Sequence, residues 1–148
     1  MRWSIGLSET DRRFNPINGA LSEAQLAWLE ETLTMAREES ETVIVLCHVP
    51  LHPRAANNKY LLWNYQSVLD LLVNSGCVVA VMAGHDHDGG YHLQDGVHHF
   101  TLSSPLHCSE GEVAYGTVGV TEEALQWKWY GEHQQIPSTM KIAFFKNC

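Results

Sequence analysis

The sequence of 148 residues contains no long apolar run and carries little positive charge. Nowhere do about 18 apolar residues follow one another, which is the length that a membrane-spanning helix requires. Nine Lys and Arg residues stand against 17 Asp and Glu residues, for a formal net charge of −8 with histidine neutral. Proteins that bind nucleic acid non-specifically need basic surface to displace counterions from phosphates. We therefore expect the protein to bind neither membranes nor nucleic acids.

Paired cysteines and a secretion signal are also missing. The four cysteines, at positions 47, 77, 108 and 148, form no Cys-x-x-Cys pair, which excludes a zinc ribbon and a thioredoxin-type motif. The first 20 residues lack the apolar core of a signal peptide. Unpaired thiols without a secretion signal are typical of a reducing compartment, so we expect a cytoplasmic protein.

The middle of the chain alternates helix and strand. Ser22 and Gln25 have the spacing of a helix-capping box, and leucines recur at helical spacing after them. Residues 42–47 form a short β-branched apolar run, which predicts a strand buried on both faces. A second helix is expected over about residues 60–74 and a second buried strand over 77–82. A strand–helix–strand unit of this size implies parallel neighbouring strands with a right-handed crossover.

The rest of the chain shows a different pattern. Residues 96–102, 115–120 and 125–130 alternate in the way that strands with one exposed face do. This pattern predicts an antiparallel meander. We expect one α/β domain with an irregular lead-in, a helix–strand–helix–strand unit, and a loop followed by antiparallel strands, over residues 1–20, 21–84 and 85–148.

Both predicted strands of the crossover unit end in histidine. His48 follows the first strand and His85 follows the second, with His87 two residues further on in a glycine-rich turn. Because parallel neighbours end at the same edge of a sheet, we expect the three imidazoles to converge there. Neutral imidazole binds zinc, manganese, iron and related ions, and glycines let the turn aim its rings at a metal. The pattern predicts a metal site formed by His48, His85 and His87.

The other polar residues have less specific interpretations. Asp86 is expected to face solvent or substrate. Asp88 is expected to orient an imidazole, with a role as a metal ligand as the alternative. Cys47 and His48 point to opposite faces of a strand and are not expected to form a nucleophile pair. The sequence has no H-E-x-x-H, G-x-S-x-G or Walker motif. The remaining six histidines are expected at the surface or in loops: His52, His92, His98, His99, His107 and His133.

The histidine motifs and their surroundings resemble a known family. An apolar strand followed by His48 and Pro50, a crossover helix and a strand ending in GHDHDGG are similar to the last two metal motifs of the calcineurin-like metallophosphoesterases. The segments FNPINGALSEAQLAWLEETL, VIVLCHVPLHP, LLWNYQSVLDLL and AGHDHDGGY resemble the manganese-dependent ADP-ribose/CDP-alcohol diphosphatases. The similarity runs from about Arg13 to Cys148 and thus covers almost the whole chain.

The resemblance implies a fold, a cofactor and a reaction. The fold would be a two-sheet metallophosphoesterase sandwich. His48 and His85 would bind one ion of a manganese pair and His87 the other, which makes all three catalytic residues. Such a pair polarises phosphoryl oxygens for in-line attack by hydroxide. The substrate would be a small nucleotide diphosphate of the ADP-ribose or CDP-alcohol type.

The first three metal motifs of this family, Asp-x-His, Gly-Asp-x-x-Asp and Gly-Asn-His, do not occur in the sequence. We therefore expect the chain to be the C-terminal half of the sandwich, inactive alone, with the missing N-terminal half as its partner. One alternative is a truncated product that binds metal or a partner without turnover. Another is an enzyme with a different substrate, a phosphodiesterase or phosphomonoesterase.

Overall fold

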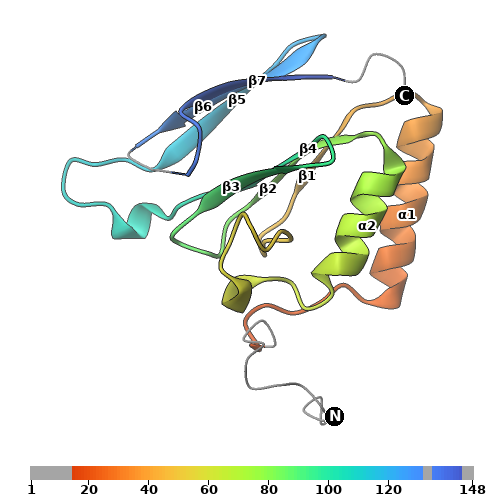
Figure 1. The fold of residues 1–148 in the computed structure, drawn as a ribbon, viewed down its shortest axis with the longest axis horizontal. Coiled ribbons are helices and arrows are strands. Elements are labelled where there is room, and N and C mark those ends of the chain that lie inside the picture. The colour runs from red at the N-terminus through yellow and green to blue at the C-terminus, as the bar shows by residue number, and fades with distance from the viewer. Residues whose placement is uncertain (1–14, 132–134, 145–148) are drawn as a thin grey trace.

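The computed structural model describes residues 15–131 and 135–144, which form three layers (Figure 1). Two helices cover one face of a four-stranded sheet, and a three-stranded sheet covers the other. The helices are α1 (Glu23–Glu38) and α2 (Tyr65–Ser75). Within the described residues, neither has the length and apolar character of a membrane-crossing helix. The structure says nothing of the predicted lead-in before residue 15, of His133 or of Cys148, which lie outside the described residues.

The ends of both helices follow from local sequence signals. The Gln25 N–H donates to the Ser22 hydroxyl at 3.3 Å, and the Ser22 N–H donates to the Gln25 side chain at 2.9 Å, which confirms the capping box. Helix α2 ends at Ser75 and is capped by Gly76, whose φ of 70° suits glycine. The second helix is shorter than predicted, because residues 58–60 form a separate 3-10 turn and α2 begins only at Tyr65.

The larger sheet has the strand order β1-β2-β4-β3. Strands β1 and β2 pair in parallel, with Leu46 opposite Met82, as the crossover pattern predicts. Strand β4 is also parallel to β2, whereas β3 is antiparallel to β4. The carboxyl ends of β1, β2 and β4 therefore lie at one edge. The bounds of β1 to β4 are Val43–Leu46, Val78–Ala83, Gly90–Gln94 and Val97–Thr101.

The antiparallel meander contains a different set of strands from the one predicted. Among the described residues, β5, β6 and β7 form it, whereas the strand expected over residues 96–102 is β4 of the larger sheet. Alternation along a strand reports which faces are buried but not which neighbour the strand pairs with. Strands β3 and β7 were not predicted. The bounds of β5 to β7 are Tyr115–Val120, Ala124–Tyr130 and Thr139–Ala143.

Strand β1 is less buried than predicted. Three of its residues are half-buried, and the side chain of Leu46 is 76% exposed. The reason is that, among the described residues, β1 is an edge strand with β2 as its one neighbour. The interior strand β2 is buried along almost its whole length, as predicted.

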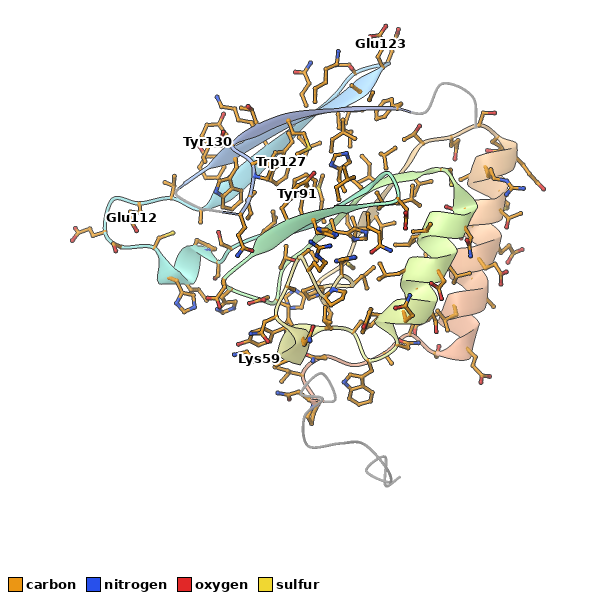
Figure 2. All side chains as sticks on the ribbon, viewed as in Figure 1. Lys59, Tyr91, Glu112, Glu123, Trp127 and Tyr130 are labelled. Carbon is orange, nitrogen blue, oxygen red and sulfur yellow. The ribbon has the colours of Figure 1, made fainter. Side chains whose placement is uncertain are left out.

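Each face of the larger sheet packs in its own core. Val78 and Val81 face the helices, where they contact a cluster that includes Leu72. Phe100 faces the smaller sheet, and its ring stacks on that of Trp127 with the centroids 4.4 Å apart. Figure 2 shows Trp127 in the layer between the two sheets. Because the larger sheet is packed on both faces, its strands hold the loops at their carboxyl ends in defined positions.

Candidate metal centre

His48 and His85 follow the ends of adjacent parallel strands, and their rings meet at the carboxyl edge of the sheet. The ring centroids lie 5.0 Å apart, with 69° between the planes. The Gly84 N–H donates to the His48 carbonyl at 3.0 Å, which continues the pairing of β1 and β2 beyond the strands. Two imidazoles that are 37 positions apart in the chain are thus brought together by strand register.

His85 has an unusual backbone conformation. Its φ is 65°, in the left-handed region that costs a non-glycine residue about 1–2 kcal/mol. The Asp86 N–H donates to the Gly84 carbonyl at 2.7 Å and closes a tight turn around His85. Strain of this kind persists only where surrounding contacts maintain it, and it is frequent at functional sites.

Asp86 supplies one of those contacts. The prediction that it faces solvent or substrate was wrong, because its side chain is only 2% exposed. Its carboxylate accepts hydrogen bonds from the Asn57 N–H at 2.7 Å and the Asp88 N–H at 3.3 Å. A buried carboxylate needs such donors, and here they come from backbone that turns back toward it. Asp86 therefore ties the histidine turn to the loop that follows His48.

Asn18 contacts His85 from the segment that was predicted to be an irregular lead-in. Its Oδ1 lies 2.9 Å from His85 Nε2, and its Nδ2 donates to the Lys59 carbonyl at 2.8 Å. Burial and then the nearby His48 lower the pKa of His85 below its ordinary value, although Asp86 opposes this shift. His85 is therefore neutral near pH 7, the state in which imidazole binds metal.

His87 lies beside another histidine. Its Nδ1 is 2.9 Å from Nε2 of His107, in the 3-10 turn Pro105–His107, and the ring centroids are 5.0 Å apart. Both rings line a cavity of about 150 Å³ together with Ser103, Ser104, Cys108 and Glu112. His107 is in a loop, as predicted, but its contact with His87 was not foreseen, because nothing in the local sequence links the two positions.

A comparison with protein-family models finds that residues 5–89 match the calcineurin-like phosphoesterases. The match covers more than half of the chain and includes both histidine motifs. The chain belongs to this family. The resemblance noted in the sequence is thus confirmed for the family as a whole.

Curated relatives of this calcineurin-like phosphoesterase are named manganese-dependent ADP-ribose/CDP-alcohol diphosphatase. The protein from Xenopus tropicalis is 40% identical over 127 residues, which are 85% of this chain and 36% of the relative. The human protein is 39% identical over 127 residues, again 85% of this chain and 36% of the relative. The chain therefore spans little more than a third of the length of these relatives.

A solved structure supports the fold. A dimetal phosphatase from Danio rerio matches this calcineurin-like phosphoesterase with a TM-score of 0.78 and 32% sequence identity. The match covers 84% of this chain and 39% of the other. The predicted α/β metallophosphoesterase fold class is therefore confirmed.

The histidines of this calcineurin-like phosphoesterase fit part of a metal site. His48 and His85 are close enough to bind one ion, since a metal–imidazole bond spans only about 2.0–2.1 Å. His87 instead contacts His107. In the described residues, no three His, Cys, Asp or Glu side chains are grouped so that they could hold a metal ion. The described residues therefore form an incomplete set of metal ligands.

Two other histidines of the calcineurin-like phosphoesterase chain are buried. His52 lies in a loop, as predicted, whereas His99 lies in β4, contrary to prediction. His52 is 3% exposed and His99 is 2% exposed. The His52 ring lies 4.6 Å from that of His92 and 4.7 Å from that of His99, between centroids, and it also hydrogen-bonds to Gln94. Burial, with smaller contributions from the neighbouring histidines, lowers the pKa of His99 to about 3. The prediction failed because β4, which carries His99, is covered on both faces.

Cys47 is not an activated nucleophile, although it precedes His48. Burial raises the pKa of its thiol to about 11, so the thiol is protonated at neutral pH. Its sulfur lies 3.4 Å from the Val49 carbonyl. This environment favours a structural role for Cys47 in the calcineurin-like phosphoesterase and leaves the imidazoles as the reactive groups at this edge.

Proposed function

We propose that this chain supplies His48, His85 and His87 as ligands of a two-manganese site that hydrolyses the diphosphate bond of small nucleotides such as ADP-ribose and CDP-alcohols. His48 and His85 bind one ion and His87 the other. The proposal rests on one observation above all, the 5.0 Å separation of the His48 and His85 rings at the carboxyl edge of parallel strands. The names of the relatives from Xenopus tropicalis and human support the metal and the substrate class.

The residues of this chain position the imidazoles. Asp86 keeps the turn around His85 closed, and Asn18 contacts the ring on one side. His107 contacts the ring of His87 in the same manner. When bound, a manganese pair supplies the positive charge that stabilises a diphosphate during hydrolysis. This accounts for a diphosphatase with a net charge of −8, since the ions take the place of basic side chains.

We further propose that residues 1–148 are the C-terminal part of one metallophosphoesterase domain, and that an N-terminal half provides the other ligands. His48 and His85 are two ligands for one ion, and His87 is one for the other, whereas catalytic zinc sites usually have three protein ligands. The edge strand β1, with its exposed Leu46, offers backbone groups to which a further strand can add. The isolated chain is then inactive or nearly so.

The same proposal specifies the binding partners of the protein and its cellular localisation. The substrate is a small nucleotide, and neither nucleic acid nor membrane is a partner of so acidic a chain. Cys47, Cys77 and Cys108 are free thiols. Free thiols favour a reducing compartment, and we place the protein in the cytoplasm.

The test measures manganese binding and ADP-ribose hydrolysis by the purified chain, alone and mixed with the N-terminal half of the Xenopus tropicalis relative. We expect manganese binding that His85→Ala weakens, no turnover by the chain alone, and turnover in the mixture. His92→Ala is the matched control, because it removes an imidazole that packs beside His52. Equal manganese affinity of His85→Ala and wild type would contradict the ligand assignment, and rapid turnover by the chain alone would contradict the ligand count.

The incomplete set of metal ligands in the described residues also supports a second candidate function. A chain with two converging imidazoles can bind one metal ion without hydrolysing anything, as a truncated product that retains only part of the site. One equivalent of manganese in the wild type, lost in His85→Ala, with no turnover in the mixture, would favour this candidate over the diphosphatase.

A further inference from the structure

We propose that Asn18 is a positioning residue that fixes the tautomer of His85 and thereby decides which ring nitrogen is available to a metal. The inference rests on the proposed role of His85 as a ligand. The two residues are 67 positions apart in the chain, yet Asn18 Oδ1 lies 2.9 Å from His85 Nε2. Asn18 itself is only 4% exposed.

The Lys59 carbonyl determines how the amide of Asn18 is oriented. An asparagine amide presents an oxygen that accepts and a nitrogen that donates, and either can in principle face a neighbour. The backbone carbonyl of Lys59 can only accept a hydrogen bond. The amide atom 2.8 Å from this carbonyl must therefore be Nδ2, as the structure has it, and Oδ1 is left to face His85.

This orientation in turn determines where the proton of His85 lies. Because Oδ1 of Asn18 cannot donate, the Nε2 of His85 must carry the hydrogen of the bond between them. A neutral imidazole has only one N–H, so Nδ1 then has a free lone pair. With the proton on Nδ1 instead, two lone pairs would face each other at 2.9 Å. The geometry points to Nδ1 as the nitrogen that binds metal.

The segment that carries Asn18 is anchored on both sides of the contact. The Trp63 N–H donates to the Gly19 carbonyl at 2.9 Å. The Leu21 N–H donates to Asn64 Oδ1 at 3.0 Å, and Asn64 Nδ2 donates to the Leu21 carbonyl at 2.9 Å. Asn18 is therefore held in place before any metal binds, which is what orienting a ligand requires.

The first experiment reads the tautomer directly in the metal-free chain. Long-range ¹H–¹⁵N spectra of the labelled protein, at a pH of about 8 where histidine is neutral, distinguish protonation at Nε2 from protonation at Nδ1. We expect His85 to be protonated at Nε2 in the wild type and in Asn18→Asp, which keeps an acceptor. Asn18→Leu removes the acceptor, and both tautomers should then be populated.

The second experiment measures affinity for manganese alone, from the electron paramagnetic resonance signal of the free ion. Loss of a residue that orients a ligand weakens metal binding about 10- to 100-fold, and we expect this of Asn18→Leu. Asn64→Leu is the matched control. It makes the same chemical change and loosens the same segment, but the bonds it removes are those to Leu21. We expect its His85 tautomer to stay as in the wild type.

Three results would overturn the proposal. These are a wild-type His85 protonated at Nδ1, an unchanged tautomer in Asn18→Leu, and an equal shift in Asn64→Leu. If Asn18→Leu does not fold, the spectrum of the wild type still shows whether His85 is protonated at Nε2, as proposed. Failure of the proposed function has a different signature, since His85→Ala would then bind manganese as tightly as the wild type while the tautomer measurement in metal-free protein remains valid.

Discussion

The Asp86 carboxylate accepts a hydrogen bond from the Asn57 N–H at 2.7 Å, across 29 residues of sequence. It thereby joins the loop after His48 to the turn that contains His85. Both loops leave the same edge of the sheet, and each depends on the other for its shape. The site is thus held by a buried carboxylate as well as by the strands beneath it.

Asp86→Ala should loosen this connection. It leaves the part-buried backbone N–H groups of Asn57 and Asp88 without their acceptor, and a hydrogen bond to a charged group contributes about 1.5–3 kcal/mol. We expect a loss of this size in the free energy of unfolding, measured with urea, and weaker binding of manganese. Asp70→Ala removes a carboxylate from the surface of α2 and should cost about 0.5 kcal/mol or less. Equal effects of the two substitutions would contradict a connecting role for Asp86.

Gly89→Ala should displace the histidine turn. A Cβ at Gly89 would lie 2.7 Å from the Ser103 nitrogen and 2.9 Å from the Thr101 oxygen, and backbone cannot yield cheaply. Gly76 is the matched control, since its φ of 70° equals that of Gly89 within one degree and a Cβ there would have no atom within 4 Å. Both substitutions cost about 1–2 kcal/mol for the left-handed conformation.

Because only Gly89→Ala also meets backbone, we expect it alone to weaken manganese binding and to shift the NMR signals of His85 and His87. Isothermal titration and heteronuclear spectra of the two variants measure this difference. Similar spectra for Gly76→Ala and Gly89→Ala would show that the turn tolerates the added methyl group.

His99 should make the protein less stable in acid. Its pKa is about 3 in the folded chain, where it is buried, and about 6.5 when unfolded. The unfolded state therefore binds more protons below pH 6.5, and the contribution of His99 to stability is complete above that pH and decreases as the pH falls toward 3. The slope is at most about 1.4 kcal/mol per pH unit. In His99→Phe, measured by urea unfolding, this part of the pH dependence should disappear, and an unchanged slope would contradict the assignment.

His107→Ala should weaken the binding of manganese by His87. The bond between His87 Nδ1 and His107 Nε2, at 2.9 Å, restricts the ring of His87. We expect about tenfold more manganese to be needed for paramagnetic broadening of the His87 ring signals, since this is the lower range for loss of an orienting partner. His107→Gln keeps a hydrogen-bonding group and should be affected less. Broadening at the same concentration in all three proteins would show that His107 has no part in orienting His87.

Local signals in the sequence were reliable where the structure depends on neighbours along the chain. The Ser22–Gln25 capping box and the glycine after α2 depend on atoms within one helical turn, and both were recognised. The parallel pairing of β1 and β2 also followed, because a crossover helix of this length permits little else. From that pairing the meeting of His48 and His85 followed directly.

The contacts between distant segments were decided only by the tertiary structure. Asp86 accepts a hydrogen bond from Asn57, and Asn18 contacts His85, although no periodicity in the sequence connects these positions. The burial of His52 and His99 likewise cannot be read from the pattern of neighbouring residues. The sequence by itself determined the helices, the crossover and the family, since these depend on local preference and short connections. The folded chain decided which groups surround each imidazole, because hydrogen bonds and burial depend on what lies nearby in space.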